Sequence, residues 1–137
     1  MKVYLDTNVL VAAFATRGLC ADLLHAVLAE HQLVIGEAAL AETQRVLRQK
    51  IRLSAAVVAE VDSFLRQEAT VVTDAKPLTI KIRDKDDLVI LAEALAGEAD
   101  ILVTGDGDLL DIADRAPLRI VTPRGLWELL RSNPDKK

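Results

Sequence analysis

The sequence predicts a single α/β domain of three layers, in which helices cover both faces of a central, mostly parallel sheet of about five strands. Short apolar runs rich in β-branched residues alternate with longer segments of helical periodicity. The chain has 137 residues, a length for one domain, and 51% of them are hydrophobic. Aromatic residues make up only 3%, so the core must be aliphatic. We expect the domain to span residues 1–131, followed by a polar tail at 132–137.

The strands are predicted from short buried-type runs that end in turn residues, charges or helix signals. These runs are Val3–Leu5, Leu33–Ile35, Thr70–Thr73, Ile101–Val103 and Arg119–Thr122. The helices are predicted from apolar residues spaced three and four apart. Ser54 suits a helix N-cap, and Pro123 suits the first position of a helix. The helical segments are Val9–Phe14, Leu19–Glu30, Glu37–Lys50, Ser54–Gln67, Leu88–Ala96 and the stretch from Pro123.

Charge and cysteine content exclude several classes of protein. The net charge of −4 is not that of a protein that coats nucleic acid by bulk attraction. The single cysteine, Cys20, rules out an internal disulfide and fits a reducing cytoplasm. Residues Met1–Asp6 suggest a strand rather than a signal peptide, and no stretch is long enough to span a membrane. We therefore expect a cytoplasmic protein without a membrane partner.

Acidic residues follow two of the predicted strands. Asp6 ends the first strand, and Asp106 and Asp108 lie in the Gly-rich turn after Ile101–Val103. Asp86 and Asp87 open the helix that leads into that strand. The carboxyl ends of parallel strands meet at one edge of a sheet, so these side chains are expected to converge there. Carboxylates in one place repel each other unless a cation lies among them, and oxygen ligands without His or Cys indicate Mg²⁺ or Mn²⁺. Phosphodiester hydrolysis is the chemistry that such a site supports.

Four motifs in this order resemble those of PIN-domain nucleases, and most of all the VapC-like ribonucleases of toxin–antitoxin pairs. The motifs are Leu5-Asp6-Thr7-Asn8-Val9-Leu10, Leu40-Ala41-Glu42, Arg83-Asp84-Lys85-Asp86-Asp87 and Val103-Thr104-Gly105-Asp106-Gly107-Asp108-Leu109-Leu110. Each motif alone is weak, whereas all four in order make a strong signal. The resemblance implies a Mg²⁺- or Mn²⁺-dependent endoribonuclease that leaves a 5′-phosphate and a 3′-hydroxyl. It also implies an antitoxin protein as partner.

The resemblance assigns roles to single residues. It implies that an acidic quartet binds the metal ions, with Asp108 as a fifth contributor, and that two polar residues hold Asp6 and Asp106 in position. The quartet is Asp6, Glu42, Asp87 and Asp106, and the supports are Asn8 and Thr104. Asp87 is preferred to Asp86 because its spacing to Ile90, Ala92 and Ala94 fits the family helix better. Family members often form homodimers, and the apolar faces within Leu19–Leu28 and Val57–Leu65 permit one.

Several of these residues have a plainer structural interpretation. Asp6 suits an N-cap, Glu42 suits a solvated charge facing Arg45, and Asp108 suits the cap of the helix that holds Leu109 and Leu110. Two basic clusters, which are usually solvated, are weak candidates for RNA contact. The candidates are Arg45, Arg48, Lys81, Arg83 and Lys85.

Two rival functions remain at this stage. A catalytically silent PIN-like module would act by binding RNA or a protein partner. A phosphatase with Asp6 as nucleophile is disfavoured because such enzymes usually need a second acid two residues later, where this chain has Asn8.

Overall fold

A computed structural model describes residues 1–82 and 84–132, and it shows a sheet with all strands parallel. The strands of this described part are β1 (Lys2–Leu5), β2 (Gln32–Gly36), β3 (Thr70–Val72), β4 (Ile101–Val103) and β5 (Arg119–Val121). Their order across the sheet is β3-β2-β1-β4-β5. Each strand lies within two residues of the segment predicted for it, and the predicted fold class is confirmed.

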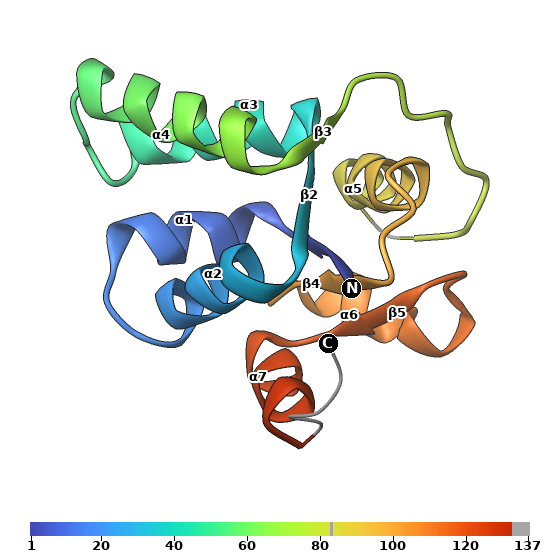
Figure 1. Ribbon diagram of the computed structural model, residues 1–137. Helices are drawn as coiled ribbons and strands as arrows, with labels where there is room; N and C mark the ends of the chain where they lie inside the picture. The colour runs from blue at the N-terminus through green and yellow to red at the C-terminus, as the bar shows by residue number, and fades with distance from the viewer. Residues whose placement is uncertain (83, 133–137) are drawn as a thin grey trace.

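Helices lie on both faces of this sheet (Figure 1). They are α1 (Thr7–Ala15), α2 (Leu19–Glu30), α3 (Glu37–Gln49), α4 (Ala55–Glu68), α5 (Lys85–Ala96), α6 (Gly107–Asp111) and α7 (Pro123–Ser132), with a 3₁₀ turn at Ala113–Arg115. Helices α1 and α2 pack together, α2 contacts α7, and α5 packs on β2 from the other side. Ser132, expected in the polar tail, is the last residue of α7. The rest of that tail, 133–137, lies outside the described residues.

The order in which the chain adds strands to the sheet reverses between β1 and β4. The chain runs from β1 to β2 and β3 on one side, then returns to place β4 and β5 on the other side. Val3, Tyr4 and Leu5 pair in register with Ile101, Leu102 and Val103. Ligand sites of open parallel sheets form at the carboxyl ends of the strands where the order reverses. The segments after Leu5 and Val103 therefore occupy the position where a ligand site is expected.

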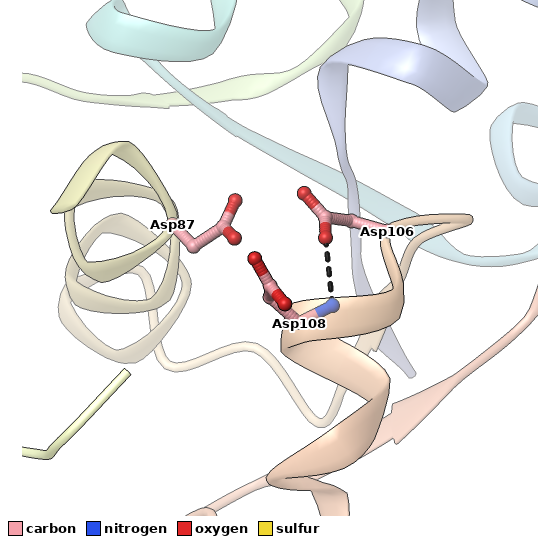
Figure 2. A group of neighbouring side chains, drawn as sticks. All are labelled: Asp87, Asp106 and Asp108. Carbon is pink, nitrogen blue, oxygen red and sulfur yellow. Dashed lines mark hydrogen bonds between the residues drawn. The ribbon is translucent and has the colours of Figure 1, made fainter. Parts of the chain in front are cut away.

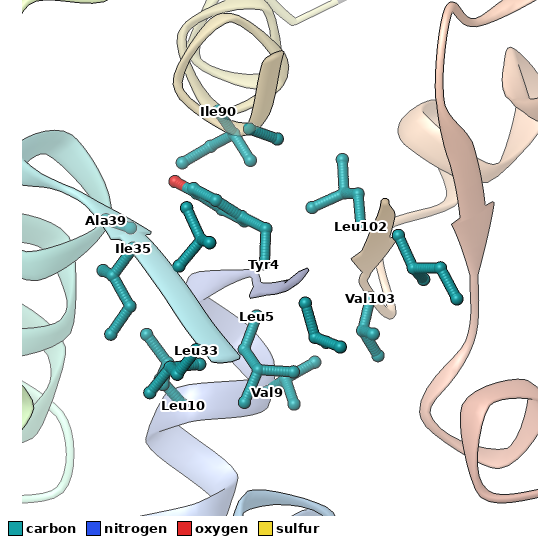
Figure 3. Close-up of a cluster of buried hydrophobic side chains, with 14 of the residues drawn as sticks. Tyr4, Leu5, Val9, Leu10, Leu33, Ile35, Ala39, Ile90, Leu102 and Val103 are labelled. Atoms are coloured by element: carbon teal, nitrogen blue, oxygen red, sulfur yellow. The ribbon is translucent and has the colours of Figure 1, made fainter. Parts of the chain in front are cut away.

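The core is aliphatic, as the composition predicts, with one buried aromatic residue at its centre. All three residues of β4 are buried, and Val3, Tyr4 and Leu5 of β1 have no exposed surface. A strand covered on both faces loses the usual alternation of apolar and polar residues. Figure 3 shows the Tyr4 hydroxyl lying between Ala39 of α3 and Ile90 of α5. The hydroxyl donates to the buried Glu93 carboxylate of α5 at 2.7 Å.

Helix α4 is more exposed than its sequence predicts. Val57 and Phe64, which belong to its apolar face, are 41% and 38% exposed. Only Val58 and Leu65 of this helix are buried. The helix packs on α3, so α3 covers only part of the apolar face of α4. The Phe64 ring meets Phe14 of α1 edge-on, with 6.2 Å between the ring centroids.

Among the described residues, no single helix is long and apolar enough to cross a membrane. Helices α1 and α2 reach that length and hydropathy only when taken together, and they are bent by 103° at the break between them.

We expect Gly97→Ala to destabilise the protein by about 1–3 kcal/mol, because an added methyl group overfills a packed core. Its Cβ would lie 2.5 Å from Cγ1 of Val34 and 2.9 Å from Cγ2 of Val72. The control is Gly107→Ala, whose Cβ meets nothing within 4 Å. Urea unfolding should show the control within about 0.5 kcal/mol of the parent. Equal losses in both variants would contradict this packing.

Candidate metal centre

Asp6 lies at the end of β1 and begins α1, where it is 4% exposed. Its Oδ1 accepts the backbone N–H of Thr7 at 2.7 Å, so it serves as the N-cap of α1. Its Oδ2 accepts the Thr104 hydroxyl at 2.6 Å and the Asn8 amide at 3.3 Å. A buried carboxylate with these donors at a helix N-terminus is fixed in one orientation. The N-cap role and the site role are therefore compatible at this residue.

Thr104 and Asn8 connect Asp6 to the turn after β4. The Thr104 hydroxyl donates to Asp6 and accepts the backbone N–H of Asp106 at 2.9 Å. The Asn8 amide oxygen accepts the backbone N–H of Gly105 at 3.1 Å. These bonds tie the carboxyl ends of β1 and β4 to each other. Asn8 and Thr104 are the two residues to which the resemblance assigned a supporting role.

Asp106, not Asp108, caps the short helix α6. The Oδ1 of Asp106 accepts the backbone N–H of Asp108 at 2.8 Å. The expectation that Asp108 caps the helix of Leu109 and Leu110 is therefore wrong. The helix begins at Gly107, which places Asp108 in its first turn and leaves its carboxylate without a capping role.

Asp87 comes from the opposite side, on the first turn of α5. It is 5% exposed, whereas the neighbouring Asp86 is exposed. Asp84 is the N-cap of α5 and accepts the backbone N–H of Asp86 at 2.9 Å. The Oδ2 atom of Asp87 is buried and has no hydrogen-bond partner among the described residues. A buried carboxylate oxygen without a donor is costly, because desolvation is not offset.

The carboxylates of Asp87, Asp106 and Asp108 point toward one another (Figure 2). One oxygen from each lies within 4.8 Å of the others. Two elements that are distant in sequence, α5 and the turn after β4, thus contribute to one cluster. Asp6 adjoins it through Thr104 and Asp106.

The electrostatics of this cluster disfavour its fully ionised state. Burial raises the pKa of Asp87 to about 7, and the neighbouring carboxylate of Asp106 adds to that rise. Burial also raises the pKa of Asp6, which the hydrogen bonds from Thr104 and Thr7 partly offset. A divalent cation would remove both the repulsion and the cost of the unpartnered Oδ2 of Asp87. The donors are all carboxylate oxygens, the set that Mg²⁺ and Mn²⁺ prefer. The residues present therefore fit such an ion.

Glu42 is near this cluster but is not part of it. Its carboxylate pairs with Arg45, with 2.6 Å between Oε1 and Nε, and its side chain is 44% exposed. The Arg45 guanidinium lowers the pKa of Glu42. Asp6, Glu42, Asp87 and Asp106 nevertheless line one groove of about 920 Å³. The structure thus brings the quartet to one groove, with Glu42 on its wall in an ion pair.

The basic residues that the sequence suggested for RNA contact are dispersed. Arg45 lines the acidic groove, together with Lys50. Arg48 donates to the backbone oxygen of Leu53 at 2.9 Å and faces a different groove, between α3 and α4. Lys81 lines a small pocket with Asp108. Lys85 is the exposed first residue of α5, and Arg83 lies outside the described residues.

Sequence reasoning missed one buried acid, Glu93, which is 5% exposed on α5. Its Oε1 accepts the Tyr4 hydroxyl at 2.7 Å. Burial and the charge of Glu93 raise the pKa of Tyr4 well above its usual value, so Tyr4 stays protonated and donates. The available signal was a charged residue between Ala92 and Ala94 on a helix that is apolar all round. Such a residue needs a buried partner.

The fold and the cluster define a class of protein: a parallel sheet with helices on both faces and an acidic site where the strand order reverses. Its family follows from its sequence. A sequence-family model described as "PIN domain" matches residues 2–108. The chain therefore belongs to the PIN-domain family. No curated protein matches it.

Solved structures share this fold at low identity. VapBC2 from Rickettsia felis, bound to a DNA fragment of its promoter, aligns with a TM-score of 0.62 and 20% identity over 89% of this chain and 98% of that chain. VapBC-1 from nontypeable Haemophilus influenzae aligns with a TM-score of 0.64 and 18% identity, covering 90% and 99%. FitAcB from Neisseria gonorrhoeae aligns at 0.55 and 15%, covering 89% and 98%. At these identities the likeness concerns the fold.

The metal-free protein is expected to lose stability as the pH rises from about 4 to about 7. Folded Asp87 keeps its proton up to about pH 7, whereas its ordinary pKa is 3.8. In that window the folded state binds more protons than the unfolded state, so the unfolding free energy falls with rising pH. Asp6 acts in the same direction. Urea unfolding in EDTA at about pH 5 and about pH 8 measures the effect.

Asp87→Asn is the control for this pH dependence, because an amide cannot ionise. The variant should show a flatter pH dependence and, near pH 8, a higher metal-free stability than the parent. A parent protein that gains stability over the same range, with no change in the variant, would refute the raised pKa of Asp87.

Proposed function

We propose that this PIN domain is a Mg²⁺- or Mn²⁺-dependent endoribonuclease. The observation that carries the proposal is the cluster of Asp87, Asp106 and Asp108. One oxygen from each lies within 4.8 Å of the others, and the buried Oδ2 of Asp87 has no donor in the described part of the chain. Such an arrangement destabilises the metal-free protein, and a role in metal-dependent chemistry explains its presence. Membership of the PIN-domain family supports a nuclease over other metal-dependent hydrolases.

The proposed ligands are Asp6, Asp87, Asp106 and Asp108, with Glu42 on the groove wall as a further acid. A bound divalent ion would polarise the phosphate and favour attack by water on phosphorus. Asp106 is held by its capping bond to α6, and Asp6 by Thr7, Asn8 and Thr104. These bonds keep the carboxylates in place before substrate arrives, which lowers the reorganisation that the reaction needs. The proposed products carry a 5′-phosphate and a 3′-hydroxyl.

The groove around the cluster is the proposed RNA site. Arg45 and Lys50 line it and can pair with phosphates of a single strand. Ile51 and Val89, which are 40% and 45% exposed, line the same groove and offer apolar surface to bases. Positive charge on one wall and carboxylates on the other fit a bound backbone that also contacts a cation.

We further propose that the protein is the toxin of a toxin–antitoxin pair and acts in the cytoplasm. Two of the similar structures are titled as VapBC proteins, which supports an antitoxin partner. A homodimer is proposed as well, with the exposed Val57 and Phe64 of α4 as available apolar surface.

A catalytically silent binding module is the second candidate, and the ion pair between Glu42 and Arg45 favours it. With Glu42 engaged, the cluster has fewer free carboxylates for metal. Metal stabilisation of the protein without RNA cleavage would identify this module.

Asp6→Asn is expected to reduce RNA cleavage about 100-fold, because an amide binds a divalent ion poorly while keeping the shape of the site. The amide oxygen can still cap α1, so the fold should persist. The assay follows cleavage of a labelled RNA in Mg²⁺, in Mn²⁺ and in EDTA. Asp114→Asn makes the same change at a side chain that is 85% exposed. A parent-like rate for Asp6→Asn, or equal losses in both variants, would refute the role of Asp6.

Glu42→Gln and Arg45→Gln are expected to change metal affinity in opposite directions. Loss of the Glu42 charge should raise the Mn²⁺ concentration for half-maximal binding about tenfold. Arg45→Gln should lower it about twofold, because the exposed ion pair that competes for Glu42 is weak. Calorimetry without RNA separates this effect from any RNA contact of Arg45. Unchanged Mn²⁺ affinity in Glu42→Gln would remove Glu42 from the site.

A further inference from the structure

Glu93 joins α5, which carries Asp87, to β1, which leads into Asp6, and to α3, which carries Glu42. Its carboxylate on α5 accepts the Tyr4 hydroxyl of β1 at 2.7 Å. It also accepts the backbone N–H of Ala38 at 2.8 Å and that of Ala39 at 3.4 Å, both in the first turn of α3. No other side chain of the described residues bonds to all three of these elements. The proposed metal centre does not include Glu93.

This carboxylate replaces the missing cap of α3. The N-cap residue of that helix is Gly36, which has no side chain to accept the free N–H groups of the first turn. Ala38 and Ala39 are the second and third residues of α3, whose N–H groups an N-cap side chain normally satisfies. Glu93 satisfies them from another helix and places its charge at the positive end of the α3 dipole.

Gly36 provides the space that this contact needs. A Cβ at Gly36 would lie 1.8 Å from Cδ of Glu93 and 1.9 Å from its Oε1. The backbone there is extended, with φ −108° and ψ 165°, so any residue could adopt it. The glycine is thus required by the position of Glu93 and not by its own conformation.

The three contacts lie close to the proposed metal-binding acids in sequence. Tyr4 precedes Asp6 by two residues on β1. Ala38 precedes Glu42 by four residues, so both lie on one face of α3, and both line the acidic groove. Glu93 and Asp87 lie on the same helix, fewer than two turns apart. A shift of α5 relative to α3 and β1 would therefore change the separation of Asp87 from Asp6 and Glu42.

We propose that Glu93 is a positioning residue for the metal centre: it sets the distance between the acids of α5 and those of β1 and α3. The inference rests on the proposed function for its catalytic consequence, but the geometric tie exists without it. This role differs from helix capping alone, which would stabilise α3 but would not fix the position of α5 relative to it.

The decisive variant is the double substitution of Glu93→Ala with Gly36→Ser. Glu93→Ala alone removes the acceptor of the Ala38 and Ala39 N–H groups and of the buried Tyr4 hydroxyl, and should lower the melting temperature by about 5–10 °C. A serine at position 36 is a good N-cap for these two N–H groups. The three atoms nearest to its Cβ all belong to the Glu93 carboxylate, which the alanine removes. The double variant restores the cap of α3 without restoring the tie to α5.

We expect the double variant to regain the part of the melting temperature that the cap of α3 supplies, because the Tyr4 hydroxyl still lacks the Glu93 acceptor. Its Mn²⁺ affinity should stay about tenfold weaker than that of the parent. RNA cleavage at limiting Mn²⁺ should stay low with it. In metal-free protein, the carboxyl carbon NMR signal of Asp87 should remain displaced from its parent position. If melting temperature, Mn²⁺ affinity and the Asp87 signal all return together, Glu93 is only a cap and the inference fails.

The Asp87 signal separates this inference from the proposed function. A parent protein that binds Mn²⁺ but does not cleave RNA refutes the nuclease and leaves the affinity test of Glu93 intact. A parent that binds no Mn²⁺ refutes the metal centre, and the Asp87 signal in the double variant still decides whether Glu93 positions α5.

Gly36→Ala tests the same contact from the other side. In the parent background its Cβ displaces the Glu93 carboxylate, so metal affinity and stability should both fall. In the Glu93→Ala background the same substitution should have little effect, because the conflicting carboxylate is gone. Ile120→Val, a conservative core change on β5 away from these contacts, serves as a stability control that should leave Mn²⁺ affinity unchanged. Additive effects of Gly36→Ala in both backgrounds would overturn the inference.

Discussion

The repulsion between carboxylates at the switch point of the sheet is the constraint on which this structure depends. Asp106 and Asp108 follow β4, and Asp87 faces them from α5, with oxygens within 4.8 Å. Burial raises the pKa of Asp87 to about 7, and the neighbouring charge of Asp106 adds to that rise. Folding must therefore hold together groups that would separate if they were free to move. A protein accepts such a local cost where the arrangement serves a function.

The rest of the fold supplies the rigidity that keeps these groups in place. Strands β1 and β4 are buried and paired in register, so the residues that follow them start from fixed points. Thr104 and Asn8 then tie the ends of the two strands together. Asp6 and Asp106 each cap a helix, so a structural bond holds the side chain that the proposed chemistry uses. Stability and function are thus combined in the same carboxylates.

Two buried acids of α5, Glu93 and Asp87, differ in how many of their oxygens accept hydrogen bonds, and this difference indicates which has a structural role and which a chemical one. Glu93 accepts three donors and holds α5 to β1 and α3. Asp87, on the same helix and equally buried, has an oxygen to which none of the residues within 1–82 and 84–132 donates. The first is a stable part of the core, because its desolvation is offset. The second has a desolvation cost that a bound cation would offset, so it says more about function.

The sequence by itself determined the fold class, the strands and most helices, because their periodicity and punctuation are local properties. It also indicated Asp6 and Asp106, since parallel strands deliver their carboxyl ends to one edge. The choice of Asp87 over Asp86 came from the family resemblance. The spacing of Glu42 and Arg45 also suggested their ion pair, which the structure confirms. Only the tertiary structure decided that Asp106 rather than Asp108 caps α6. Only it revealed Glu93, because the donors of that carboxylate lie 54, 55 and 89 residues away in the chain. Contacts at such separations depend on how helices pack, which no local pattern of residues encodes.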